Sequence, residues 1–315
     1  MAITSDRILQ GVGRRISNPI SQGLLENDDV LAFCDDIVQA EIIPILESAQ
    51  QDYFIERVDI PLVAGQSQYD IPYRSVARGL REIKLTSSDQ QWMRNLPLIA
   101  IENAYQYYQW STICGFYFLG DKIQLIPEVP NPLSTEQNLA IWYRLPPNQL
   151  VELDQVAQVV SVSDPDVVVD GIPGTMSAGV NIDFVQGKSG NSIYSFDDPI
   201  VSVNTGTNTI TFAADVVPSN LVAGDYICLS GESYVLNFIP NEAYPLVETL
   251  TCMRCLQAVS DFDGMKVLEM AAERERTNLA KILEPRIDGE PKIVVNYWSI
   301  ARGYKQNQRS WLYGN

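Results

Sequence analysis

The sequence predicts an α+β fold, in which an antiparallel helical bundle of long N- and C-terminal helices carries inserted antiparallel β domains and ends in an extended C-terminal arm. Three observations lead to this prediction. Apolar residues recur every three or four positions over residues 28–54 and again over 241–285. Between these regions the apolar period becomes two, which is typical of half-buried strands. Residues 286–315 show no apolar face of helix length.

Composition places the chain among folded, water-soluble proteins. Of its 315 residues, 46% are hydrophobic and 19% are charged, which is typical of globular proteins. It lacks the run of about eighteen apolar residues that a membrane helix needs. Its start, MAITSDRILQ, lacks the basic and apolar parts of a signal peptide. We therefore expect a protein that is made in a cytosol and stays there unless it leaves inside a particle.

The net charge is strongly negative and unevenly distributed. The chain carries 22 basic and 39 acidic residues, a formal charge of -17. Residues 285–315 are the exception, with five basic and two acidic side chains. Because nucleic-acid binding needs Lys and Arg to displace counterions, the acidic excess argues against free DNA binding and fits a surface that does not adhere to DNA. The basic end has the right sign for an acidic partner surface.

Residues 1–57 are expected to form the N-terminal helical part of the bundle. The segment from Asn27 to Phe54 begins with capping and acidic residues and continues at helical spacing. With Pro44 as a kink, it predicts a helix of about 26 residues, on the order of 40 Å long. Its acids form either a solvated helix face or, in a ring, a negative wall around the lumen. The candidate residues are Asp28, Asp29, Asp35, Asp36, Glu41 and Glu47.

Two β regions and a second helical region follow. Residues 58–150 predict an antiparallel β domain, with one hairpin around residues 65–67 and a second that turns at 87–89. Residues 101–110 can form a helix within it. Residues 151–239 are rich in Val and Ile and have regularly spaced turns, which suits a small sandwich or barrel-like insertion.

Residues 240–285 are expected to form the C-terminal helical part of the bundle. Asn241 can cap the first helix, and Pro285 ends the region. A break is allowed at residues 261–264, where Gly264 follows two aspartates. The two helical regions would then close together as one antiparallel bundle.

The sequence offers few groups for catalysis or metal binding. It contains no His, the commonest general base and metal ligand. The five Cys are an odd number in a chain without a signal peptide, which indicates reduced thiols. Cys252 and Cys255 form one CxxC at helical spacing, which favours small core-facing residues over the alternative, a redox dithiol. We predict no enzymatic activity, no cofactor and no metal site.

Short motifs do not change this prediction. GVGRR at 11–15 follows no strand, so it is not a dinucleotide-binding loop. QGKSG at 186–190 ends like a phosphate-binding loop, but Ile182 stands where that loop needs a glycine, and a hairpin turn is favoured. Two carboxylate pairs lie in turn-like sequence, where Asp accepts backbone hydrogen bonds more often than it binds Ca²⁺ or cleaves a glycoside. These pairs are Asp164 with Asp166 and Asp197 with Asp198.

Residues 286–315 predict an extended arm that docks on another molecule. The segment is basic and rich in Trp and Tyr, and Trp, Tyr and Arg are the side chains that anchor interfaces. The alternative is a strand that folds back on its own domain.

The order of these features resembles the head-to-tail adaptor, or connector, proteins of short-tailed and related tailed bacteriophages. The resembling segments cover most of the chain in sequence order. They are the acidic helix at 28–54, YDIPYRSVARGLREIKLTSSD (69–89), GFYFLGDKIQLIPEVP (115–130), LAIWYRLPPNQLV (139–151), VPSNLVAGDYICLSGESYVLNFIPNEAYPLV (217–247) and ILEPRIDGEPKIVV (282–295).

The resemblance implies a structural virion protein that forms a twelve-subunit ring between the portal and the tail. In such adaptors the C-terminal arm grips the portal protein, and the β regions face tail nozzle or fibre proteins. DNA would pass through the ring without specific binding, and no membrane would be involved. The implied portal-docking residues are Tyr297, Trp298, Arg302, Tyr304, Lys305, Arg309 and Trp311.

Two other functions remain open on the sequence. The chain could be another tail component, such as a nozzle or fibre-anchoring protein, in which residues 151–239 carry the binding role. It could also be a glycan-binding or glycan-degrading β protein. That function needs clustered exposed aromatics, and residues 151–239 contain no Trp.

Overall fold

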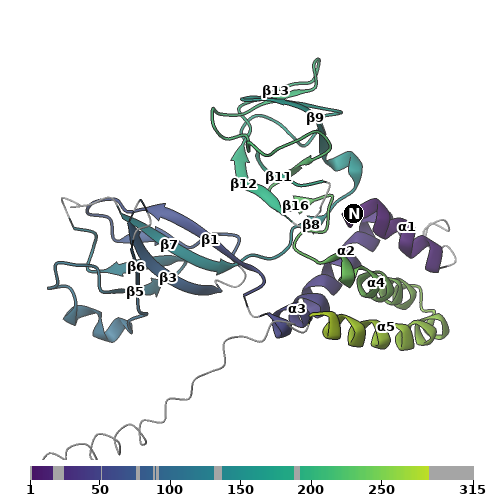
Figure 1. The fold of residues 1–315 in the computed structure, drawn as a ribbon, viewed down its shortest axis with the longest axis horizontal. Coiled ribbons are helices and arrows are strands. Elements are labelled where there is room, and N and C mark those ends of the chain that lie inside the picture. The colour runs from purple at the N-terminus through teal and green to yellow at the C-terminus, as the bar shows by residue number, and fades with distance from the viewer. Residues whose placement is uncertain are drawn as a thin grey trace, which may run out of the picture. The chain divides into compact units, whose positions relative to one another are not determined.

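The computed structural model describes residues 2–16, 25–50, 52–75, 79–87, 89, 92–130, 137–187 and 192–283 (Figure 1). Contacts divide the chain into two units, Met1–Ile282 and Leu283–Asn315. The elements described all lie in the first unit, apart from the final residue of the last helix.

The predicted fold class is wrong, because sheets dominate the described residues. Sixteen strands form four sheets, and the largest sheet has seven strands. These residues contain no bundle of long N- and C-terminal helices. Their α-helices are α1 (Ser5–Arg15), α2 (Asn27–Ile37), α3 (Ile43–Ala49), α4 (Tyr244–Ala258) and α5 (Phe262–Leu283).

The long N-terminal helix expected over residues 28–54 is interrupted. After α2 the chain forms a π-helical turn, η2 (Val38–Ile42), before α3 begins. The N–H of Ile43 donates to the carbonyl of Val38, five residues back. Pro44 follows in the first turn of α3. Because proline has no N–H and its ring clashes with the carbonyl four residues earlier, the ordinary α-helical ladder cannot continue through it, and the wider turn accommodates it.

Helix α4 is the most deeply buried of the helices, and α1 and α2 pack against it. Gly11 of α1 lies against Glu248 of α4, where a Cβ atom would overlap the carboxylate. This glycine of the GVGRR sequence therefore permits a close helix contact. Arg15 of α1 then pairs with Glu248, with 3.0 Å between Nη2 and Oε2.

The chain does break between α4 and α5, near the predicted residues 261–264. Ser260 has a φ of 62°, a left-handed conformation that ends a helix. Asp261 then accepts a 3.0 Å hydrogen bond from the N–H of Gly264, in the first turn of α5. The broken helices and the sheets between them replace the two long antiparallel helices that were expected.

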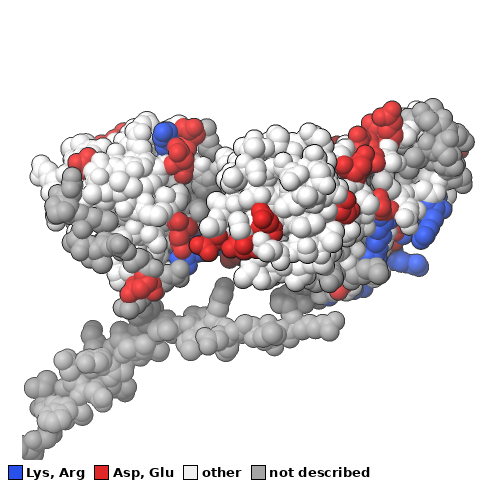
Figure 2. Space-filling model, turned by 90° about the horizontal axis from the view of Figure 1, so that it is seen from above, with Lys and Arg blue, Asp and Glu red and all other residues white. Residues whose placement is uncertain are grey.

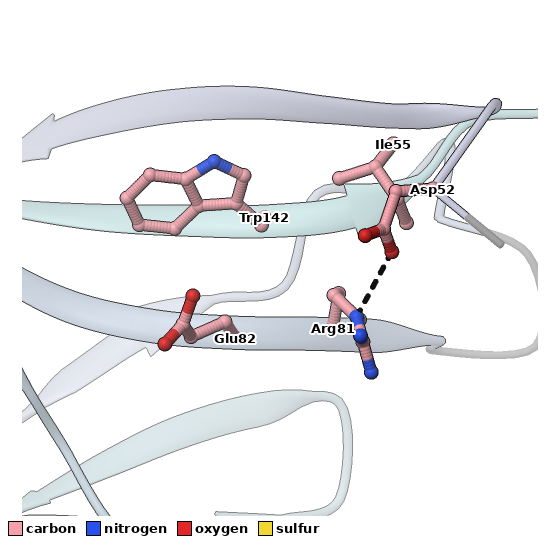
Figure 3. Close-up of a pocket in the computed structure, with 5 residues that line it drawn as sticks. All are labelled: Asp52, Ile55, Arg81, Glu82 and Trp142. Atoms are coloured by element: carbon pink, nitrogen blue, oxygen red, sulfur yellow. Dashed lines mark hydrogen bonds and ion pairs between the residues drawn. The ribbon is translucent and has the colours of Figure 1, made fainter. Parts of the chain in front are cut away.

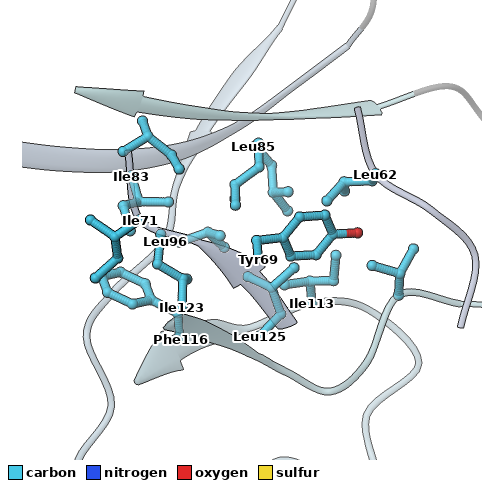
Figure 4. Close-up of a cluster of buried hydrophobic side chains, with 13 residues drawn as sticks. Leu62, Tyr69, Ile71, Ile83, Leu85, Leu96, Ile113, Phe116, Ile123 and Leu125 are labelled. Atoms are coloured by element: carbon cyan, nitrogen blue, oxygen red, sulfur yellow. The ribbon is translucent and has the colours of Figure 1, made fainter. Parts of the chain in front are cut away.

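The first β region contains two antiparallel sheets that enclose one apolar core (Figure 4). The four-stranded sheet has the order β1-β7-β3-β4, and the three-stranded sheet has the order β2-β6-β5. Leu85 and Ile141 of the larger sheet share the core with Tyr69 and Leu125 of the smaller one. The strands are β1 (Ile55–Pro61), β2 (Gln68–Asp70), β3 (Leu80–Ser87), β4 (Met93–Asn95), β5 (Gly115–Leu119), β6 (Lys122–Ile126) and β7 (Gln137–Arg144).

One of the two predicted hairpins is confirmed. Strands β3 and β4 pair across the turn at 87–89, with Thr86 opposite Met93. The hairpin around residues 65–67 is wrong, although strands do lie on both sides of that turn. Strand β1 pairs with β7 and β2 pairs with β6, so the turn carries the chain from one sheet to the other. Residues 101–106 form a 3₁₀ helix, η4 (Ile101–Gln106), where a helix was expected.

The second β region is one seven-stranded antiparallel sheet with the order β12-β11-β15-β9-β10-β14-β13. The ring centroid of Phe184 on β11 lies 5.0 Å from that of Phe212, which follows β14. The two strands are far apart in the sheet order. Both side chains lie in one apolar core, around which the sheet wraps. Its strands are β9 (Ala157–Ser163), β10 (Asp166–Val169), β11 (Asn181–Val185), β12 (Ile193–Pro199), β13 (Ser202–Asn204), β14 (Thr209–Thr211) and β15 (Tyr226–Leu229).

Short elements complete the fold. A parallel pair joins β8 (Gln149–Leu150) to β16 (Glu232–Ser233). The 3₁₀ helices η5 (Leu153–Gln155) and η6 (Asn241–Ala243) precede β9 and α4.

Candidate interaction surfaces

The acidic residues predicted on the first helix divide into two groups. Three are partnered by distant parts of the chain. Glu47 pairs with Arg144 of β7, with 2.7 Å between Oε1 and Nε, and Glu41 pairs with Arg276 of α5. Asp35 accepts a 3.0 Å hydrogen bond from the backbone N–H of Leu150. Because these carboxylates meet the rest of the chain, they do not line a shared open face.

The other three acids lie on the outer side of α2. Asp29 accepts a 3.0 Å hydrogen bond from the backbone N–H of Glu26 and so helps to cap the helix. Asp28 and Asp36 are exposed and form no ion pair with another described residue. Ala32 is also exposed and lies between them in the sequence. A smaller acidic face therefore remains, and whether it lines a lumen stays a prediction.

Asp35 is the acid of α2 whose chemistry is most altered by the fold. Burial raises its pKa to about 7, and the nearby charge of Asp36 also raises it, while the hydrogen bond from Leu150 acts in the opposite direction. The Asp35 carboxylate links α2 to β8, and residues of these two elements contact each other. Its protonation therefore changes near neutral pH at a contact between a helix and a strand.

The predicted docking arm lies outside the described residues. This applies to all seven predicted docking residues: Tyr297, Trp298, Arg302, Tyr304, Lys305, Arg309 and Trp311. Their role in docking stays a prediction.

The two carboxylate pairs considered for chemistry form contacts within the chain. Asp166 accepts a 2.7 Å hydrogen bond from Thr211 Oγ1, and Asp164 precedes a cis proline in the turn before β10. Asp197 Oδ1 lies 2.7 Å from Arg74 Nη2, and Asp198 accepts a hydrogen bond from the hydroxyl of Ser195. Among the described residues, no group of three His, Cys, Asp or Glu side chains could hold a metal ion.

The cysteines are all free thiols, and four of the five are buried. Cys252 and Cys255 lie on α4, and burial raises the pKa of Cys252 to about 12 and that of Cys255 to about 11. A raised pKa lowers the thiolate fraction, which is the reactive form. These properties favour the core-facing interpretation of the CxxC over a redox dithiol. Cys114 is the one that is partly exposed.

A segment with several exposed aromatic side chains runs from the end of β4 into β5 in the first β region and was missed by sequence reasoning. Helix η4 packs there through Ala104, which shares a small cluster with Ile99 and Ile126. Seven large apolar side chains between positions 98 and 119 are nevertheless 41% to 68% exposed. These residues, called the aromatic surface below, are Leu98, Ile101, Tyr105, Tyr108, Trp110, Phe118 and Leu119.

The aromatic surface is almost free of charge. Glu102 is the single charged residue between positions 98 and 119, in a chain whose acidic side chains are spread over the face seen in Figure 2. Depletion of charge together with enrichment in Tyr and Trp is the composition of the central part of a protein interface. The two Gln residues interspersed among the aromatics of YQYYQW were the available signal, because a fully buried helix would not carry them there.

A second exposed apolar face lies on α5. Only Ala272 and Leu279 of its 22 residues are fully buried. Val267 is 75% exposed and Met270 is 82% exposed. A helix of this length with so little burial gains little stability from its own chain.

An open groove of about 630 Å³ lies on the outer side of the four-stranded sheet (Figure 3). Trp142 lies at one end of it, with Arg57 5.0 Å and Lys84 4.9 Å from the ring centroid. At the other end Arg81 Nε pairs with Asp52 Oδ1 at 3.1 Å. Because Arg81, the cation that lines the groove, and the two cations beside Trp142 already have acidic or aromatic partners, this groove has less to offer a ligand than the aromatic surface has.

No protein-family model matches the sequence, and the search of curated proteins found no match either. No helix among the described residues is both long and apolar enough to cross a membrane.

Proposed function

We propose that the chain is a structural virion protein, the head-to-tail adaptor of a tailed bacteriophage, which assembles as a ring between the portal and the tail. The order of the resembling segments, from 28–54 to 282–295, supports this proposal. The proposed ring has about twelve copies, as in the proteins that the chain resembles. The basic segment 286–315 binds the portal.

The observation that carries the proposal is the aromatic surface at positions 98–119. Its exposed Tyr105, Tyr108 and Trp110 are residues of the type that supply most of the binding energy in protein interfaces. An apolar surface of this kind is costly to leave in water and is therefore a docking site for a protein. In the adaptor, its partner is a protein of the tail.

The negative charge of the chain serves the passage of DNA. A ring of copies, each with a formal charge of -17, produces a negative potential around its channel. DNA phosphates are repelled by this potential, so DNA moves through the ring without adhering. The exposed Asp28 and Asp36 contribute to it wherever they face the channel.

The proposal is tested in the virus that encodes the chain, with a stop codon placed early in its reading frame. Electron microscopy of the particles is expected to show heads without tails, and supplying the intact chain in trans restores tailed particles. Tailed, infectious particles formed without the chain would refute the adaptor function.

A variant separates the two ends of the adaptor. Tyr105→Ser/Tyr108→Ser/Trp110→Ser, supplied in trans, is expected to give heads that contain the chain but lack tails. Val160→Ser/Val201→Ser, which alters exposed apolar residues of the other β region, is the matched control and gives tailed particles. Heads that lack the triple variant itself would place the aromatic surface on the head side and contradict its assignment to the tail.

A further inference from the structure

The exposed face of α5 combines apolar and basic side chains. Val267 and Met270 are 75% and 82% exposed. Arg274 and Lys281 follow at helical spacing, are exposed, and form no hydrogen bond or ion pair with another described residue. Arg276, by contrast, is turned toward its own chain and binds Glu41 and Glu273. This face therefore has no partner within the described part of the chain.

The exposed face of α2 has the opposite charge. Asp28, Asp29 and Asp36 are exposed on it, with the small side chain of Ala32 between them, and Ala40 is exposed in the π-helical turn η2 that follows α2. Two copies of a chain with a charge of -17 repel each other. A contact between copies is therefore favoured where a basic face of one copy meets an acidic face of the next.

The spacing of the charges on the two helices is the same. Arg274 and Lys281 are seven residues apart, and so are Asp29 and Asp36. Seven residues are two helical turns, a rise of about 10.5 Å, which keeps both members of each pair on one face. Each base of one helix can therefore meet one acid of the other.

We propose that the α5 face of one copy docks on the α2 face of a second copy. In an antiparallel arrangement Arg274 lies opposite Asp36 and Lys281 lies opposite Asp29. The same register places Met270 opposite Ala40 and Asn278 opposite Ala32, so the long apolar side chain meets a small one. The inference rests on the proposed function, because it names the contact between copies that builds the ring.

The two faces are different, so the contact is heterologous. Each copy offers its α5 face to one neighbour and its α2 face to the other. Such head-to-tail contacts close into a ring when the rotation from one copy to the next is a whole-number fraction of a full turn. Each contact is weak on its own, and closure of the ring strengthens the binding of every copy, because each copy is then held by two contacts.

Charge-reversal variants of the full chain test the contact. The first variant, Asp28→Lys/Asp36→Lys, makes both faces basic and leaves the helix cap at Asp29 intact. The second variant, Arg274→Glu/Lys281→Glu, makes both faces acidic. Asp121→Lys/Asp154→Lys, at exposed positions outside both helices, changes the net charge as the first variant does and serves as its control.

Sedimentation velocity of each protein alone, from about 1 µM to about 300 µM, measures the association. The original chain and the control are expected to associate as concentration rises. For each variant by itself, the dissociation constant for self-association is expected to be at least about tenfold higher. A mixture of the two variants regains association, because each contact between the two variants then joins a face of net positive charge to an acidic face. No association of the original chain, or no recovery in the mixture, would overturn the proposal.

A cross-link gives a second readout that does not depend on charge. In a chain with Cys114→Ser, the pair Ala40→Cys/Met270→Cys is expected to form disulfide-linked ladders of copies under mild oxidation. The control pair Ala40→Cys/Glu269→Cys places the second thiol on another side of α5 and yields monomers. Equal ladders from both pairs would contradict the register. Because these tests use the chain alone, the contact between copies can be refuted while the chain still binds the portal. The contact can also be supported while binding to the portal fails.

Discussion

Arg74 and Asp183 form a buried bidentate ion pair, with Arg74 Nη1 2.9 Å from Asp183 Oδ2 and Nη2 2.8 Å from Oδ1. The Asp183 side chain is fully buried and that of Arg74 is 9% exposed. Arg74 follows β2 of the first β region, and Asp183 lies on β11 of the seven-stranded sheet. Asn148 Nδ2 also donates to Asp183, at 2.7 Å. One carboxylate thus joins three segments that are distant in sequence.

The first prediction concerns this pair. Arg74→Met leaves the carboxylate of Asp183 buried without its cation, and is expected to lower the free energy of unfolding by about 3–5 kcal/mol. Urea denaturation followed by circular dichroism measures the loss. The matched control, Arg276→Met, removes a half-exposed pair with Glu41 and is expected to cost about 1 kcal/mol or less. Equal losses in the two variants would contradict the account of Arg74.

The second prediction concerns pH. The pKa of Asp35 is raised to about 7 in the folded chain, so between about pH 4 and pH 7 the folded state binds a proton that the unfolded state has released. The contribution of Asp35 to stability is therefore present at low pH and is lost as pH rises toward 7. Asp35→Asn has no such proton, and Asn can still accept the hydrogen bond from Leu150.

The measurement is the free energy of unfolding of both proteins at pH 5 and pH 8. The difference between Asp35→Asn and the original chain is expected to shift in favour of the variant at pH 8, by about 1.4 kcal/mol for each pH unit between pH 5 and the folded pKa of about 7. The same difference at both pH values would show that Asp35 does not titrate in this range.

The third prediction concerns the thiols. Four cysteines are buried, and burial raises the pKa of Cys252 and Cys255, so that N-ethylmaleimide is expected to modify Cys114 first in the folded chain. Mass spectrometry after brief exposure near pH 7.5 locates the label, and exposure in urea provides the fully labelled control. Labelling of Cys252 or Cys255 as fast as Cys114 would revive the redox dithiol interpretation.

The fourth prediction concerns the aromatic surface. Tyr105→Ser/Tyr108→Ser/Trp110→Ser removes side chains that are 52% to 68% exposed, so the free energy of unfolding is expected to change little, by about 0.5 kcal/mol per residue. Binding to the tail partner should nevertheless weaken by about 2 kcal/mol or more for the strongest anchor. A large loss of stability in urea denaturation would mean that these residues hold the fold together instead.

The sequence locates many elements but not their partners. The strands on both sides of residues 65–67 are where the period of two places them, yet each pairs with a strand much later in the chain. Pairing of this kind depends on which faces can be buried together, which local periodicity does not record. The π-helical turn before Pro44 is likewise a response of the whole helix to one residue.

The acidic helix face shows the same limit at the level of side chains. Spacing alone groups Glu41 and Glu47 with Asp28 and Asp36. In the fold, Arg276 and Arg144, more than ninety residues away in sequence, pair with Glu41 and Glu47. Of these four acids, Asp28 and Asp36 form no ion pair with a described residue. The aromatic surface was missed for a related reason, because a helix pattern indicates an apolar side but not how much of it the rest of the chain will cover.

The most direct test of the central claim is mass photometry of the chain mixed with the portal ring of the same virus. A copy truncated after Glu290 is measured beside it. The full chain is expected to add a ring of subunits to the portal, about one for each portal subunit, and the truncated copy is expected to add none. A portal whose mass is unchanged by the full chain would contradict the adaptor function, and equal binding by both copies would contradict the role of the C-terminal arm.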